Sequence, residues 1–212
     1  GSPYLTHTPR LGQASTPGGG PGRKGRGMAI DLLQRSHLLR LFTAHAQAMP
    51  AQAFEAAQFS RFVHAHPQCC ARELVVGHLT GAAWLVDRSG QRVLLTHHRK
   101  LDRWLQLGGH ADGDADLARV ALREAGEESG LPGLRVEAPI FDLDRHWIPA
   151  YGGEAGHWHY DVRFVVRCTE TEDYVVSAES HALAWRPIAG VADEPGVDES
   201  LRRMARLWLA RS

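Results

Sequence analysis

The chain has 212 residues, of which 43% are hydrophobic and 23% charged, and its 24 basic and 24 acidic residues leave no formal net charge. This is enough for a buried core of ordinary size, but no apolar run approaches the roughly 20 residues that a membrane span requires, and no basic excess favours nucleic acid. We therefore expect a soluble, enzyme-sized domain with neither a membrane nor a nucleic-acid partner, and the three cysteines, too few for a disulfide framework, indicate a cytoplasmic location.

The first 27 residues are rich in Pro and Gly and carry a basic GRKGRG stretch, which predicts a disordered tail or a vector-derived linker. Residues 28–66 form a helical extension, with apolar stripes from Met28 to Met49 and from Ala51 to Val63 on either side of Pro50. We expect these helices to pack on the main domain, residues 67–212, or on a second subunit, which would make a homodimer. His45, within the first helix, is expected to be exposed or capping.

The main domain begins with strand patterns. A hairpin is expected from residues 74–86 and 92–96, and the apolar stretch WLQL, Trp104 to Leu107, predicts the next strand. A helix follows, with Leu117, Ala121 and Ala125 recurring at i, i+4 and i+8. Further strands are expected over 134–147, 158–168 and 184–188, before a closing amphipathic helix that Asp198 caps. This order predicts a mixed sheet between helices.

Three carboxylates lie on one face of the helix after WLQL. Glu124, Glu127 and Glu128 are spaced i, i+3 and i+4, so they share one face within one turn. Like charges so placed repel each other, which predicts a divalent cation among them. The alternative is a solvated acidic face. Asp114 is the expected N-cap of this helix, and Gly130 is expected at its C-terminal end.

The run from Gly109 to Leu131 resembles the Nudix box, G-x5-E-x7-R-E-U-x-E-E-x-G-U, where U is a bulky apolar residue. The matching residues are Gly109, Arg123, Glu124, Glu127, Glu128, Gly130 and Leu131, with the small Ala125 at the first U position. Ala115 stands where the pattern has its first glutamate, which removes one outer carboxylate. The resemblance implies a Nudix α/β/α sandwich with a mixed sheet, here preceded by two N-terminal helices.

The resemblance also implies an activity, namely hydrolysis of a diphosphate bond in a nucleoside diphosphate linked to another group, or in a nucleoside triphosphate. Glu124, Glu127 and Glu128 would bind Mg2+ or Mn2+, and Arg123 would orient them. A water activated by the metal would attack phosphorus, with Glu124 or Glu179 taking its proton.

Several residues flanking the box are candidate substrate ligands. The basic residues before the central strand would face phosphates, and the aromatic residues of the 144–156 segment would stack on a base or merely pack. An ordinary polar loop is the alternative for the basic set. The candidate substrate ligands are His97, Arg99, Lys100, Gly108, Gly109, Trp147 and Tyr151.

A second group of candidate metal ligands consists mainly of histidines. His157, His159 and Asp161 alternate along one strand and therefore lie on one face, and a His-x-His pair on a strand can reach one metal ion. Imidazole favours a transition metal such as Zn2+ or Mn2+. The alternative is that these histidines lie on the strand surface or donate hydrogen bonds to substrate. The candidates for this second metal site are His78, His110, His157, His159 and Asp161.

The histidine positions are similar, more loosely, to those of isopentenyl diphosphate isomerase, a Nudix-fold relative. His78-Leu79, Gly109-His110 and His157-x-His159 fall at comparable places. The isomerase pattern has a cysteine where this chain has Gly108, so its proton donor is missing. Three hypotheses follow: a Nudix pyrophosphohydrolase first, a catalytically silent nucleotide-binding regulator second, and a prenyl diphosphate isomerase third.

Overall fold

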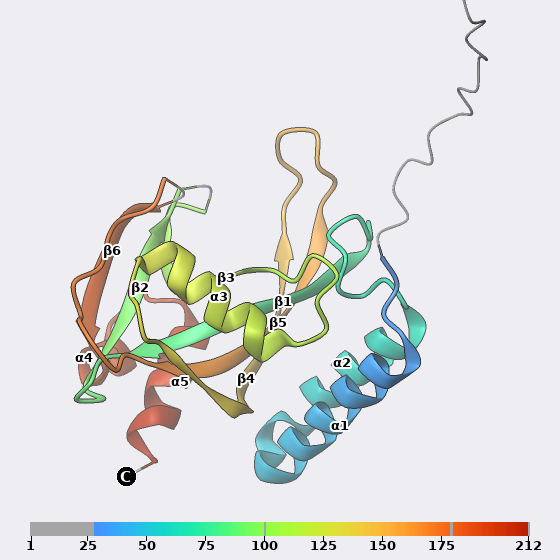
Figure 1. Ribbon diagram of the computed structural model, residues 1–212, viewed down its shortest axis with the longest axis horizontal. Helices are drawn as coiled ribbons and strands as arrows, with labels where there is room; N and C mark the ends of the chain where they lie inside the picture. The colour runs from blue at the N-terminus through green and yellow to red at the C-terminus, as the bar shows by residue number, and fades with distance from the viewer. Residues whose placement is uncertain (1–27, 100, 179, 212) are drawn as a thin grey trace, which may run out of the picture.

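The chain folds around a six-stranded mixed sheet with helices on both faces (Figure 1). This computed structural model describes residues 28–99, 101–178 and 180–211. The predicted tail, residues 1–27, and the candidates Lys100 and Glu179 lie outside the described residues. In chain order the elements are α1 (Leu32–Ala48), the 3-10 turn η1 (Pro50–Gln52), α2 (Ala53–Ala65), β1 (Gly77–Val86), β2 (Arg92–His98), β3 (Arg103–His110), α3 (Leu117–Ser129), β4 (Arg135–Ile148), β5 (His157–Arg167), β6 (Ser180–Pro187), α4 (Ile188–Asp193) and α5 (Glu199–Leu209).

The strand order is β4-β5-β1-β3-β2-β6, in which β1 and β5 run parallel and all other neighbours in this order pair antiparallel. β1 and β2 form the predicted hairpin only at its base, where Val86 pairs with Val93. Beyond that point β3 lies between them and pairs with β1 from Leu107 to His110. The end of β3 therefore reaches the middle of the sheet, next to the start of β1.

The two faces of the sheet are covered by different helices. On one face, Leu79 and Phe164 pack in one cluster with Phe59 of α2 and Val120 of α3. On the other face, Trp84 and Val165 pack with Leu201 and Met204 of α5. The expected α/β/α sandwich with a mixed sheet is confirmed. Among the described helices, none is both long enough and apolar enough to cross a membrane.

The N-terminal helices pack on the sheet of their own chain. α1 begins with a capping box, in which Asp31 and Gln34 bond each other's backbone N–H. Phe59 of α2 meets the ring of Tyr160 edge to face, at 5.2 Å between centroids. The expectation that His45 is exposed or capping is wrong. Its ring is buried and shares a 2.7 Å hydrogen bond with Gln52, because α1 faces the sheet here.

Candidate functional site

α3, which carries the three glutamates, lies close against the sheet. A side chain at Gly81 of β1 would place Cβ 2.8 Å from Cγ1 of Val120, so only glycine permits this approach. The helix ends as predicted at Gly130, which is left-handed with φ of 68°. The predicted N-cap, Asp114, is wrong: the helix begins two residues later and Asp116 caps it, with its side chain accepting from the Arg119 backbone N–H.

The delayed start follows from the burial of Ala115. Its side chain is only 4% exposed and belongs to the cluster that joins α1, α2 and the sheet. Asp114, on the surface side, instead accepts the Asp116 backbone N–H and pairs with Arg119 at 2.7 Å. The position that lacks the box's first carboxylate therefore lies in the core, where an unpaired charge would be costly.

Two of the three glutamates point at consecutive residues of β3. Gly108 donates its backbone N–H to Glu128 Oε1 at 3.2 Å. A Cβ on Gly109 would lie 2.5 Å from Glu124 Oε2, so the carboxylate occupies space that the glycine leaves open. Glu127 is exposed. Of the predicted substrate ligands, Gly108 and Gly109 thus contact the glutamates themselves.

Arg123 connects the glutamates to the end of β3. Its Nη2 donates to the backbone oxygen of His110 at 3.0 Å and to Glu124 Oε1 at 3.1 Å. These contacts hold the Glu124 carboxylate without help from a side chain at position 115. Carboxylate oxygens are the ligands that Mg2+ and Mn2+ prefer, so the chemistry of this donor set fits the divalent ion expected from the sequence.

The predicted basic phosphate ligands lie on the β2–β3 hairpin. His97 pairs across the hairpin with Trp104, four residues and about 13 Å of strand from Gly108. Its Nε2 lies 3.2 Å from Asp102 Oδ1. Arg99 is exposed beyond it, at the turn. The structure therefore places His97 and Arg99 toward the turn of this hairpin, and their substrate role stays a prediction.

The predicted aromatic ligands lie in the segment that connects β4 and β5, which projects from the sheet (Figure 1). Trp147 is 50% exposed and packs edge to face on Trp158, at 5.3 Å between centroids. Tyr151 is 72% exposed and forms an isolated bridge with Glu154. Trp147 therefore packs on one side and is exposed on the other, and its stacking on a base stays a prediction.

The predicted histidines come together at the same end of the sheet. His78 of β1 pairs in register with His159 of the parallel β5, and His110 of β3 pairs with Thr80, two residues further along β1. Gly81 faces α3, so its neighbour Thr80 faces the other side of the sheet, and so does His78, because residues two apart on a strand share a face. Their pairing partners His110 and His159 lie on that same face, opposite α3. Ring centroids lie 5.1 Å apart for His78 and His110, and 4.9 Å apart for His78 and His159.

One ring nitrogen from each of His78, His110 and His159 lies within 4.8 Å of the others, which is close enough to surround one ion. His157 adjoins them, with its Nε2 3.2 Å from Nε2 of His159. Burial and neighbouring imidazoles lower the pKa of His78 to about 4 and that of His159 to about 2. Burial also lowers the pKa of His110. Near neutral pH the rings of His78 and His159 are therefore uncharged.

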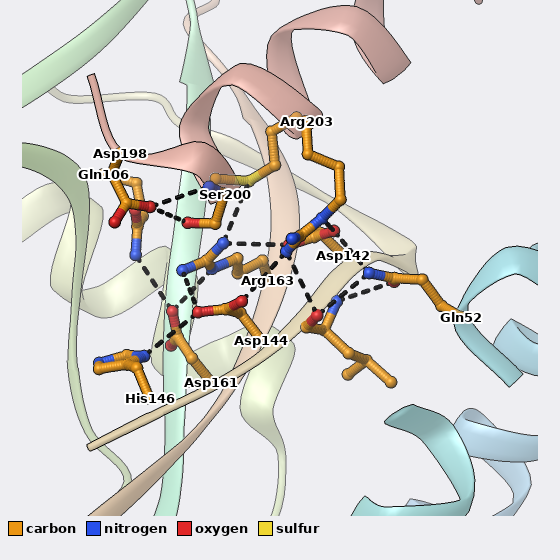
Figure 2. Close-up of polar contacts among 12 residues, drawn as sticks. Gln52, Gln106, Asp142, Asp144, His146, Asp161, Arg163, Asp198, Ser200 and Arg203 are labelled. Carbon is orange, nitrogen blue, oxygen red and sulfur yellow. Dashed lines mark hydrogen bonds and ion pairs between the residues drawn. The ribbon is translucent and has the colours of Figure 1, made fainter. Parts of the chain in front are cut away.

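Asp161, the remaining candidate, follows His159 by two positions on β5 but is bonded to other partners, of which Figure 2 shows Gln106 and Arg163. Its Oδ1 accepts from the Thr80 hydroxyl at 2.9 Å. Its Oδ2 accepts from Gln106 at 3.1 Å and from Arg163 Nε at 2.8 Å. The structure therefore brings Asp161 to the site as a neighbour whose oxygens are already bonded.

Arg163 belongs to a buried ionic network that motif analysis missed (Figure 2). Its side chain is 2% exposed and contacts three carboxylates, those of Asp161, Asp142 and Asp144, at 2.8, 3.0 and 3.5 Å. Burial alone would lower the pKa of Arg163, but the three carboxylates raise it above its ordinary value. Arg203 of α5 binds Asp142 and Asp144 as well.

His146 is a further residue missed from the sequence. It pairs in register with His159 across β4 and β5, their ring centroids lie 5.5 Å apart, and its Nδ1 lies 3.4 Å from Asp144 Oδ2. Burial tends to raise the pKa of Asp144, but His146, Arg163 and Arg203 lower it well below its usual range. The alternation of Asp144 and His146 along the strand was the one available signal.

Comparison with known proteins identifies the family of the region that contains both the glutamates and the histidines. A family model for the NUDIX domain matches residues 77–207, more than half of the chain. No curated protein matches the chain.

Among solved structures, a C. elegans Ap4A hydrolase binary complex is similar with a TM-score of 0.50 and 16% identity, over 62% of this chain and 95% of that one. A MutT protein from Methanosarcina mazei Go1 has a TM-score of 0.49 and 16% identity, over 65% and 96%. A NUDIX-family hydrolase from Clostridium perfringens has a TM-score of 0.48 and 19% identity, over 64% and 98%. The first of these shows the same fold.

Proposed function

We propose that this chain, which belongs to the NUDIX domain family, is a pyrophosphohydrolase that uses Mg2+ or Mn2+ to hydrolyse a diphosphate bond. The proposed substrate is a nucleoside diphosphate linked to another group, or a nucleoside triphosphate. One observation carries the proposal: Glu124 and Glu128 of α3 converge on the consecutive Gly108 and Gly109 of β3.

The glutamates have the chemistry for this reaction. Glu124, Glu127 and Glu128 would hold the ion, which when bound neutralises phosphate oxygens and lowers the pKa of a water molecule. Arg123 donates to Glu124 Oε1, and the Gly108 backbone N–H donates to Glu128 Oε1. Glu124 would also take the proton of the attacking water. Glu179 is the alternative base.

Substrate recognition is proposed for side chains on two flanking hairpins. Trp147 and Tyr151 are exposed aromatic residues, which suits stacking on a nucleobase. His97, Arg99 and Lys100 would bind the phosphate that lies farther from the cleaved bond. An arginine is well suited to this because its planar guanidinium binds phosphate through two parallel hydrogen bonds.

The structure argues against the isomerase alternative. A Cβ at Gly108 would lie 2.8 Å from Ala82 Cβ and 2.9 Å from the Gly81 backbone oxygen. β3 therefore has no room for the cysteine that the isomerase pattern has here. The silent regulator is the second candidate, and the buried Ala115 favours it because one carboxylate of the box is absent.

The deciding experiment is a panel of nucleoside triphosphates and nucleoside diphosphates linked to sugars, to a second nucleoside or to other groups, each incubated with Mg2+ or Mn2+. Products are separated chromatographically, and reaction in 18O-labelled water identifies the phosphorus that is attacked. We expect turnover of at least one class by the wild type, and none by Glu127→Gln with an unchanged circular dichroism spectrum.

Binding without turnover by the wild type would support the silent regulator instead. Equal rates for wild type and Glu127→Gln would remove the glutamates from the mechanism. Glu137→Gln is the matched control, because Glu137 lies on β4 and pairs with Arg167 and Arg211.

A further inference from the structure

We propose that His78, His110, His157 and His159 bind one transition-metal ion, with Zn2+ as the preferred ion, on the face of the sheet opposite α3. This site is separate from the proposed magnesium or manganese site and takes a different class of metal. It does not depend on the pyrophosphohydrolase activity.

The four histidine rings are placed to supply ligands to one ion. Three strands, β1, β3 and β5, each deliver one imidazole of a trio, and the ligand atoms of these three lie within 4.8 Å of one another. His157 supplies the fourth, because its Nε2 lies 3.2 Å from Nε2 of His159. Two nitrogens bound at about 2.0–2.1 Å to one tetrahedral zinc are themselves about 3.3 Å apart. These two rings are thus already spaced as two ligands of one ion.

His78 provides an independent indication of a ligand. Its side chain is 2% exposed, and neither ring nitrogen has a hydrogen-bond partner. Buried polar atoms are rarely left unpaired, because they lose their bonds to water without replacement. The ring lies within 5.1 Å, centroid to centroid, of His110, His157 and His159. A metal at the centre of the four rings would satisfy one of the two nitrogens.

The ligand atoms of these four histidines favour a transition metal over Mg2+. The four rings carry no negative charge, and Asp161 is occupied by Thr80, Gln106 and Arg163, so the donors are imidazole nitrogens alone. Imidazole suits Zn2+ and similar transition metals, whereas Mg2+ prefers oxygen.

The position of the site indicates what the ion would do. It would join the start of β1, the end of β3 and the start of β5, where residues from distant parts of the chain meet. Ligands that bind only the folded state raise its stability. Because His110 follows Gly109 directly, an ion here would also fix the stretch of β3 that Glu124 and Glu128 contact.

The test is metal binding by the full chain after treatment with a chelator. We expect one equivalent of Zn2+ by elemental analysis, a rise in Tm on addition of Zn2+, and the visible absorption bands of tetrahedral cobalt when Co2+ replaces it. His110→Ala and His157→Ala should each weaken Zn2+ affinity by at least about 100-fold, more than the loss of a supporting residue outside the ligand set.

Two controls keep the result interpretable. His64→Ala removes an exposed histidine from α2 and should bind Zn2+ like the wild type. Glu127→Gln should also retain Zn2+, even where it loses hydrolysis, so the two proposals fail separately.

Absence of stoichiometric Zn2+ in the wild type, or wild-type affinity in folded His110→Ala and His157→Ala, would overturn the site. Loss of Zn2+ in Glu127→Gln would overturn it too, by assigning the ion to the glutamates. If His110→Ala does not fold, His157→Ala decides, because His157 is only half-buried and lies near the start of β5.

Discussion

Arg123 is bonded to the backbone of His110, with its Nη2 3.0 Å from the carbonyl oxygen. The same nitrogen donates to Glu124 Oε1 at 3.1 Å. One guanidinium thus connects a proposed ligand of Mg2+ to the strand that carries a proposed ligand of Zn2+. The two sites lie on opposite faces of β3 and share this connection.

Replacing Arg123 tests that connection. Arg123→Lys keeps the charge but cannot bond both acceptors with the same planar geometry, so we expect kcat to fall about 10- to 100-fold. Steady-state rates with Mn2+ measure the effect. Arg119→Lys is the control on the same helix, since Arg119 forms a surface ion pair with Asp114 that contributes little. An unchanged kcat in Arg123→Lys would mean that Glu124 does not need this support.

Gly109→Ala should displace the Glu124 carboxylate, because the added Cβ would lie 2.5 Å from Oε2. We expect a loss of about 100-fold or more in kcat/KM with little change in Tm, since a small misplacement of a reacting group is costly. Gly126→Ala is the matched control on α3, where a Cβ meets nothing within 4 Å. It should keep activity and stabilise the helix by about 0.5–1 kcal/mol. Wild-type activity in Gly109→Ala would contradict the placement of Glu124.

Ala115→Glu restores the glutamate of the Nudix pattern, but at a buried position. We expect destabilisation of several kcal/mol in urea unfolding and no gain in activity, because the added charge has no partner in that cluster. Ala57→Glu, at an exposed position of α2, should stay within about 0.5 kcal/mol of the wild type. A stable and faster Ala115→Glu would show that this segment can move to the surface.

Arg163→Met removes the buried cation that contacts Asp161, Asp142 and Asp144, and leaves Arg203 to pair with only the last two. We expect a loss of about 3–5 kcal/mol in the free energy of unfolding, measured in urea. Arg167→Met removes a half-exposed partner of Glu137 on the same strand and should cost no more than about 1 kcal/mol. Similar losses in the two variants would mean that the buried network is not a main source of stability.

Asp87 provides a test of acid stability far from both sites. Burial raises its pKa, but hydrogen bonds from Arg92, Ser89 and the Gln91 backbone lower it more, so the net pKa is below its ordinary 3.8. The unfolded chain therefore binds the proton first. The stability due to the carboxylate is present above pH 3.8 and is lost as pH falls through the folded pKa.

Asp87→Asn should be less stable than the wild type at pH 7, by about 1–3 kcal/mol, because it loses charge-assisted bonds. The difference in the free energy of unfolding between the wild type and Asp87→Asn should become smaller as the pH falls below 3.8. Urea unfolding across the pH range measures this difference. Asp193→Asn, at an exposed position in α4, should follow the wild type throughout. A gap that does not change with pH would contradict the lowered pKa.

Local patterns in the sequence predicted most of the helices and strands, although not α4 or the N-cap of α3. The spacing of Leu117, Ala121 and Ala125 predicts α3, and those three side chains are buried in it. Asp198 was expected to cap the last helix and does so, with its side chain accepting from the Ser200 backbone N–H at 2.9 Å. These predictions succeed because a helical period and a cap depend on residues within one or two turns of each other.

Contacts between strands were harder to predict. The sequence places His157 and His159 on one face of a strand, but not beside His78, which lies about 80 positions earlier and meets His159 only through the parallel register of β1 and β5. Arg163 and His45 look like surface residues in the sequence, and both are buried with polar partners. Burial of this kind depends on what packs across the sheet.

By itself, the sequence determined the helix that carries Glu124, Glu127 and Glu128 and the strand that carries His157 and His159, because each rests on a repeat of 3.6 or 2 residues. Only the tertiary structure decided that β3 separates the two groups, with Glu124 on one side of Gly109 and His110 on the other. It also decided that Ala115 is buried and that Asp161 is already bonded. The physical reason is that register and burial are properties of strands and helices packed together, and no short stretch of sequence specifies its partners.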